Sequence, residues 1–184
     1  HHLAAAGCQP TLVLLCRRSE LHGDALLHFQ KLAGGVGVFE LPSATEMSEI
    51  VAETNPATVV DGLLGTGLKG DVREPFISAI NFINALRLPT VAIDIPSGLD
   101  SDTGEVHGVC VRADLTVTMG LPKIGLLRPA AADYVGSIEV ADIGQQETQR
   151  VAQAAVAFDD ALQNLVGERQ FARVVGAGDP EPDD

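Results

Sequence analysis

Aromatic and basic residues are both scarce in this sequence. Its 184 residues include no tryptophan, one tyrosine and six phenylalanines, too few for a base-stacking platform or a membrane-interface belt. Only 12 Lys and Arg stand against 25 Asp and Glu, which gives a net charge of −13. The broad positive surface of a DNA-binding or anionic-membrane-binding protein is therefore not expected, and an anionic ligand would need a local site.

Cysteines and long apolar runs are scarce as well. Cys8, Cys16 and Cys110 show neither C-x-x-C nor His-paired spacing, so we expect no disulfide framework and no zinc site. No apolar run approaches the roughly 18 residues of a membrane span, and the first residues have no signal-peptide pattern. These features predict a cytoplasmic location, or a mitochondrial one in a eukaryote.

Short apolar runs do alternate with longer amphipathic stretches. We predict strands at 11–16, 36–41, 58–64, 90–95, 115–119 and 137–140, and helices at 19–32, 43–54 and 74–86. This alternation predicts an α/β fold with a mainly parallel sheet and helices on both faces. The composition changes near residue 144, so we predict one domain over 1–144 and a divergent helical and acidic tail over 145–184.

The glycine-rich segment Gly65–Gly70 (GTGLKG) follows the strand predicted at 58–64. It satisfies G-x-G-x-x-G, but the next helix is predicted to begin near Glu74, beyond the last glycine. A dinucleotide fingerprint places its glycines at the helix start, so a dehydrogenase-type or methyltransferase-type Rossmann domain is disfavoured. Backbone N–H groups and Lys69 could bind a phosphate; an ordinary turn with a solvated lysine explains the segment about as well.

Two carboxylates interrupt apolar runs near the predicted strand ends. Asp61 lies in VVDGLL and Asp94 in VAIDIP, followed by Ser97. A charge there is costly unless it is hydrogen-bonded, paired or bound to a cation. If the two strands are neighbours, both acids and the glycine-rich segment meet in one crevice, although either Asp could simply cap a turn.

Lys69 and Lys123, two of the three lysines, follow strands and are compatible with an anionic ligand.

Three segments, 60–75, 92–100 and 120–127, together resemble the YjeF N-terminal family, whose best-known members are NAD(P)H-hydrate epimerases. The resemblance covers about residues 1–144 and implies a Rossmann-like three-layer α/β/α sandwich, often dimeric. It implies that Asp61 and Ser97 help to hold a potassium ion. The residues that it implies for substrate contact are Gly65, Thr66, Gly67, Leu68, Lys69, Gly70, Asp71 and Asp94.

The sequence also departs from that family. Family members carry an Asn-Asn-Gly-Gly-Asp loop after their first strand, which supplies another potassium ligand and substrate contacts. No equivalent occurs in this sequence, and we expect that the chain begins after the point where this loop would stand. The segment 145–184 does not resemble the dehydratase domain that is fused to many bacterial members.

The function implied by this resemblance is epimerisation of hydrated NADH and NADPH (NADHX and NADPHX) at the nicotinamide C6, by a homodimeric protein. A carboxylate that gives and takes a proton suits this reaction, with Asp61 as the first candidate and Asp94 as the second. The alternative is a non-catalytic YjeF-like module that binds nucleotides or belongs to an RNA-processing scaffold.

Overall fold

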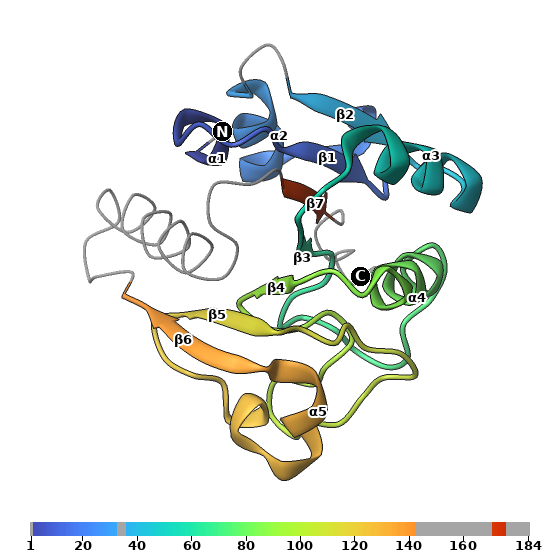
Figure 1. Ribbon diagram of the computed structural model, residues 1–184. Helices are drawn as coiled ribbons and strands as arrows, with labels where there is room; N and C mark the ends of the chain where they lie inside the picture. The colour runs from blue at the N-terminus through green and yellow to red at the C-terminus, as the bar shows by residue number, and fades with distance from the viewer. Residues whose placement is uncertain (1, 33–35, 143–170, 176–184) are drawn as a thin grey trace, which may run out of the picture.

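The computed structural model of the chain describes residues 2–32, 36–142 and 171–175. Within these residues the strands form one seven-stranded sheet in the order β2-β1-β7-β3-β4-β5-β6 (Figure 1). All neighbouring strands run parallel. The strands are β1 Thr11–Leu14, β2 Gly37–Glu40, β3 Thr58–Gly62, β4 Thr90–Ile93, β5 Leu115–Met119, β6 Ser137–Ala141 and β7 Phe171–Val175. The predicted α/β fold with a mainly parallel sheet is confirmed.

The helices follow local sequence signals. α3 (Ala44–Thr54) begins with a capping box in which Ser43 accepts a hydrogen bond from the Glu46 amide and Glu46 accepts one from the Ser43 amide. The other α-helices are α1 His2–Ala5, α2 Gly23–Gln30, α4 Phe76–Leu86 and α5 Ala132–Val135. Short 3-10 turns span Arg18–Glu20, Ile124–Leu127 and Pro129–Ala131. Among these described helices none is long and apolar enough to cross a membrane.

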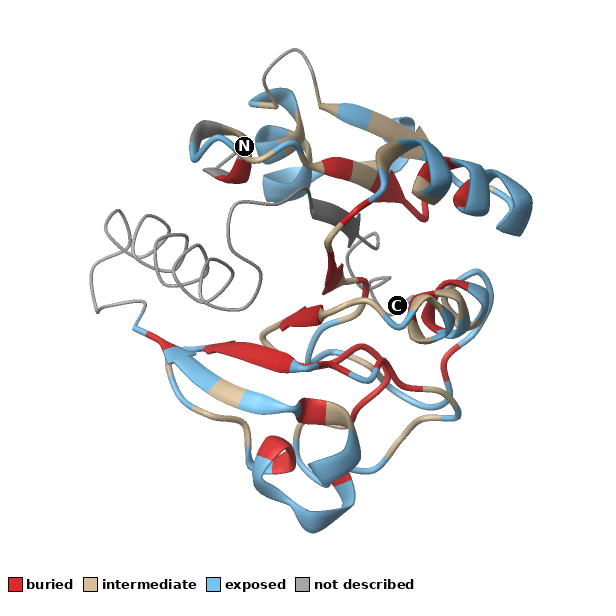
Figure 2. Ribbon diagram, in the orientation of Figure 1, coloured by how far each residue is buried: buried red, intermediate tan, exposed pale blue. Residues whose placement is uncertain are grey.

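Successive side chains of β3 lie on opposite faces of the sheet. Val59 packs in one apolar cluster with Ile80 and Ile83 of α4, while Val60 packs in another with Leu3 of α1. Because side chains alternate along a strand, α4 and α1 cover opposite faces. β3, β4 and β5 are accordingly buried along most of their length (Figure 2), which is typical of a parallel sheet covered on both sides.

The strand β7 was not predicted from the sequence. It lies between β1 and β3, and Val174 is paired with Val13 on one side and with Asp61 on the other. A five-residue strand next to Gln- and Ala-rich sequence gives a weak local signal, and its position depends on pairing with strands far away in the chain. The predicted helix within 145–170 and the acidic segment after Val175 lie outside the described residues, and the domain boundary at residue 144 stays a prediction.

Candidate functional site

The two carboxylates lie at the ends of adjacent strands. Asp61 is the fourth residue of β3, Asp94 directly follows β4, and β3 pairs with β4 through Asp61 and Ala92. The carboxyl ends of parallel strands share one edge of the sheet, which is where ligands bind in open α/β folds. The condition set by the sequence, that the two strands be neighbours, is therefore met.

Asp61 is fully buried and accepts hydrogen bonds on both carboxylate oxygens. Its Oδ2 accepts from the Ser97 amide at 2.8 Å, and its Oδ1 accepts from Ser97 Oγ at 2.6 Å and from the Leu63 amide at 3.2 Å. Burial raises the pKa of Asp61, and the hydrogen bonds from Ser97 and Leu63 oppose that rise. Within the described part of the chain no basic side chain forms an ion pair with this carboxylate.

Ser97 connects Asp61 to the start of the glycine-rich segment. Its hydroxyl oxygen accepts a hydrogen bond from the Leu64 amide at 2.9 Å and lies 3.3 Å from the Leu64 carbonyl oxygen. Carboxylate, hydroxyl and carbonyl oxygens therefore gather at one buried point. These are the ligand types that hard cations prefer, whereas no cluster of three or more His, Cys, Asp or Glu side chains occurs among the residues that the structure describes.

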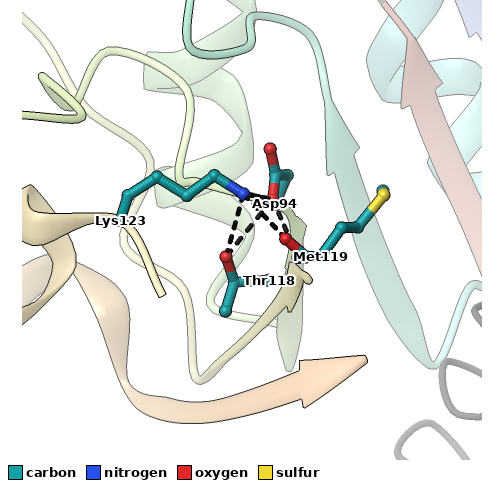
Figure 3. A network of polar contacts seen from close by, with 4 residues as sticks. All are labelled: Asp94, Thr118, Met119 and Lys123. Atoms are coloured by element: carbon teal, nitrogen blue, oxygen red, sulfur yellow. Dashed lines mark hydrogen bonds and ion pairs between the residues drawn. The ribbon is translucent and has the colours of Figure 1, made fainter. Parts of the chain in front are cut away.

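Asp94 has a different environment. Its φ of +68° lies in the left-handed region, which a non-glycine residue occupies only when its surroundings enforce it. Its Oδ1 accepts hydrogen bonds from Thr118 Oγ1 at 3.2 Å and from the Met119 amide at 2.9 Å, and it forms an ion pair with Lys123 Nζ (Figure 3). No described residue donates a hydrogen bond to Oδ2, and the side chain is 25% exposed.

Lys123 contacts Asp94, and the sequence predicted this contact only in part. Its position after a strand is compatible with an anionic ligand, and the anion that it contacts in the structure is the carboxylate of Asp94. The signal for this pairing was weak because the two residues are 29 positions apart, and only the parallel pairing of β4 with β5 brings their backbones together.

The glycine-rich segment 65–70 is largely exposed at the same sheet edge, as is Asp71 after it. The segment follows β3, and the chain just beyond it is anchored by a hydrogen bond from the Val72 amide to the His107 carbonyl at 3.1 Å. Lys69 is exposed and forms no ion pair with a described residue. α4 begins at Phe76, two residues after the predicted start at Glu74, so these glycines precede the helix by several residues, as the sequence predicted.

Comparison with known proteins identifies the family. Residues 1–125 match the family model described as YjeF-related protein N-terminus. The chain belongs to this family. The matched range includes Asp61, the glycine-rich segment, Asp94, Ser97 and Lys123, so every side chain of the candidate site lies within the YjeF-like region.

Several similar proteins have names that state an activity. A bifunctional NAD(P)H-hydrate repair enzyme of Salinibacter ruber is 43% identical over 152 residues, which cover 78% of this chain and 28% of that protein. An NAD(P)H-hydrate epimerase of Levilactobacillus brevis is 46% identical over 116 residues, which cover 63% of this chain and 53% of that protein. An NAD(P)H-hydrate epimerase of Cenarchaeum symbiosum is 37% identical over 143 residues, which cover 78% of this chain and 65% of that protein. The chain thus spans between about a quarter and two thirds of the length of these relatives.

Proposed function

We propose that this chain is an NAD(P)H-hydrate epimerase domain that interconverts the R and S forms of hydrated NADH and NADPH. Relatives at 37–46% identity bear the name NAD(P)H-hydrate epimerase or bifunctional repair enzyme. The observation that carries the proposal is the carboxylate of Asp94. One of its oxygens is saturated by three donors and the other has no described partner, at the sheet edge that also carries the open glycine-rich segment.

The reaction needs a group that handles a proton beside a ring that becomes positively charged. The hydrated nicotinamide carries a hydroxyl on the carbon next to the ring nitrogen. Once this hydroxyl is protonated, the nitrogen lone pair can expel it as water. The resulting iminium ion takes up water on its opposite face and loses a proton, which inverts the centre. Water and proton are both returned, so the overall composition does not change. A positioned carboxylate accelerates such proton transfers by about 10²–10⁴.

The geometry favours Asp94 over Asp61 for this role, which reverses the order that the sequence suggested. Both oxygens of Asp61 are occupied by Ser97 and Leu63, and the side chain has no exposed surface. Asp94 Oδ2 has no such partner and the side chain is partly exposed, so a substrate could reach it. The glycine-rich segment 65–70, with its backbone amides and Lys69, would bind the phosphates of the nucleotide.

We further propose a potassium ion beside Asp61. A buried carboxylate without a basic partner is costly, and the oxygens of Asp61, Ser97 and the Leu64 backbone offer donors of the required type. When bound, the ion supplies the positive charge that compensates Asp61. Asp61 and Ser97 themselves fix the turn after β4, which keeps Asp94 and the glycine-rich segment in place.

The direct test of the function is a turnover assay. A preparation enriched in one epimer of NADPHX is incubated with the protein in potassium buffer, and both epimers are followed by chromatography above the spontaneous rate. We expect interconversion, and an Asp94→Asn variant that is slower by about 10²–10⁴. Asp102→Asn, which changes an exposed acid in a neighbouring turn, serves as the matched control and should retain the wild-type rate. Binding of NADPHX without interconversion would favour the non-catalytic module.

The potassium proposal has a separate test. Thermal unfolding is followed in potassium chloride and in choline chloride of equal ionic strength. A ligand that binds only the folded protein raises the free energy of unfolding by RT ln(1 + [L]/Kd). Potassium should therefore raise the melting temperature of the wild-type protein. Asp61→Asn should lose this rise while Asp102→Asn keeps it. Equal melting temperatures of the wild-type protein in both salts would contradict a potassium site.

Homodimerisation, which the family resemblance implies, and a cytoplasmic location, which the cysteine usage favours, also remain proposals. Light scattering coupled to size-exclusion chromatography measures the mass in solution directly. A mass of one chain at micromolar concentration would contradict the dimer.

A further inference from the structure

The side-chain nitrogen of Lys123 lies among three oxygen atoms at the ends of β4 and β5. It pairs with Asp94 Oδ1 and donates hydrogen bonds to Thr118 Oγ1 at 3.2 Å and to the Met119 carbonyl at 3.3 Å (Figure 3). An ammonium group has three N–H donors, and each of them has an acceptor here. Lys123 therefore has no donor left for a substrate while this arrangement persists.

The same arrangement makes the two oxygens of Asp94 unequal. Oδ1 receives Lys123, Thr118 and the Met119 amide, while Oδ2 receives no described donor and points away from that cluster (Figure 3). Charge-assisted hydrogen bonds are shorter and stronger than neutral ones. The ammonium therefore fixes the orientation of the carboxylate and leaves Oδ2 as the oxygen without a described hydrogen-bond donor.

The backbone that carries Lys123 is itself held in place. The Gly120 amide donates to the Ala141 carbonyl at 2.9 Å, and the Gly125 amide donates to the Ser101 carbonyl at 2.7 Å. A Cβ atom at Gly125 would lie 2.2 Å from the Asp100 carbonyl oxygen, so the chain approaches its neighbour as closely as glycine allows. Lys123 thus projects from a segment that is fixed on both sides.

From this geometry we propose that Lys123 is a positioning residue, which acts through Asp94 by orienting its carboxylate so that Oδ2 meets the reacting centre. This inference rests on the proposed epimerase function. It predicts that removal of the ammonium slows the reaction step more than it weakens substrate binding, because all three N–H donors of Lys123 have acceptors within the protein. A misplacement of about 1 Å in a catalytic group can cost about 100-fold in rate.

The test combines substitution with chemical rescue. Lys123→Ala removes the ammonium and leaves the three oxygens of Asp94, Thr118 and Met119 without it. We expect kcat to fall about 10- to 100-fold while KM changes less than about threefold. Methylammonium, which keeps three N–H donors, should restore much of kcat; tetramethylammonium, which has none, should not. Lys31→Ala, which removes an exposed lysine at the end of α2, is the matched control and should match the wild type with and without either ion.

Several outcomes would overturn the inference. A wild-type kcat in Lys123→Ala shows that the ammonium is not needed, and a raised KM with unchanged kcat shows that Lys123 contacts the substrate. Equal effects of the two amines show that rescue does not use N–H donors. If Lys123→Ala fails to fold, Lys123→Gln, whose side chain is one bond shorter, keeps two N–H donors without the charge, and it must show the same loss in kcat. An inactive wild type overturns the proposed function itself, and the inference with it.

Discussion

Asp61 and Asp94 are two carboxylates at neighbouring strand ends with opposite surroundings. Asp61 is fully buried and its hydrogen bonds come from two residues of the turns beside it, Leu63 and Ser97. Asp94 is partly exposed and pairs with a lysine. The first suits a structural or cation-binding role and the second suits contact with a ligand, because only an accessible group can exchange a proton with a substrate.

The buried Asp61 should leave a signature in the pH dependence of stability. Burial raises its pKa in the folded protein, so above the usual pKa near 4 the folded state binds more protons than the unfolded state. The free energy of unfolding therefore falls as pH rises through this window. Asn cannot ionise, so Asp61→Asn should lack this component. Denaturant unfolding in potassium-free buffer should show the variant gaining stability relative to the wild type as the pH rises above about 4. A constant difference would contradict the prediction.

Gly98 is the residue where the turn beside Asp94 tolerates no side chain. Its φ is +95°, and an added Cβ would lie 1.9 Å from the Val109 carbonyl oxygen. Gly98→Ala should therefore lower the free energy of unfolding by about 3 kcal/mol or more. Gly23→Ala is the control: φ is +52° but no atom lies within 4 Å of the added Cβ, so it should cost only about 1 kcal/mol. Equal losses of unfolding free energy in the two variants would show that the close contact at Gly98 does not determine the destabilisation.

The position of the candidate site could be predicted from the sequence, but its internal contacts could not. A charged residue inside an apolar run marks a strand end, which located Asp61 and Asp94 at one edge of the sheet. The pairing of Lys123 with Asp94 depends on β4 lying beside β5 and on the turn after β5, neither of which has a local sequence signal. The difference in burial and hydrogen bonding between Asp61 and Asp94 depends on the same long-range packing.

At the scale of elements, β7 decides whether the sheet is continuous. It pairs with β1 on one side and with β3 on the other, so it links the β2-β1 pair to the four strands that begin with β3. The sequence located the other strands and the helices α3 and α4 closely, because each has a periodic apolar pattern and clear ends. It missed β7, whose assignment depends on pairing with strands more than a hundred positions away.

Shortening the chain tests the role of β7. A variant that ends at residue 170 lacks this strand, so β1 and β3 lose their shared partner. It should lose most of the 5–15 kcal/mol that typically stabilises a domain and unfold without a cooperative transition. A variant that ends at Val175 keeps β7 and should retain a cooperative transition. Circular dichroism with denaturant measures both, and a cooperative transition in the shorter variant would show that the remaining strands form a stable sheet alone.

At the scale of the whole molecule, the net charge of −13 opposes the proposed substrate. Hydrated NADH and NADPH carry a negatively charged pyrophosphate, and NADPHX carries one more phosphate. Lys69 supplies a local positive charge in the exposed glycine-rich segment, whereas the ammonium of Lys123 already pairs with Asp94. Long-range electrostatics should therefore slow the approach of the substrate, and short-range contacts should hold it once it is bound.

The ionic strength dependence of KM tests this balance. Salt shortens the distance over which charges interact, from about 30 Å at 0.01 M to about 8 Å at 0.15 M. Raising choline chloride over that range at constant potassium should therefore lower KM, because the long-range repulsion is screened first. The decrease should be larger for NADPHX than for NADHX, since the extra phosphate adds repulsion at a distance. A KM that rises with salt for both substrates would mean that the local attraction at Lys69 outweighs the net charge of the chain.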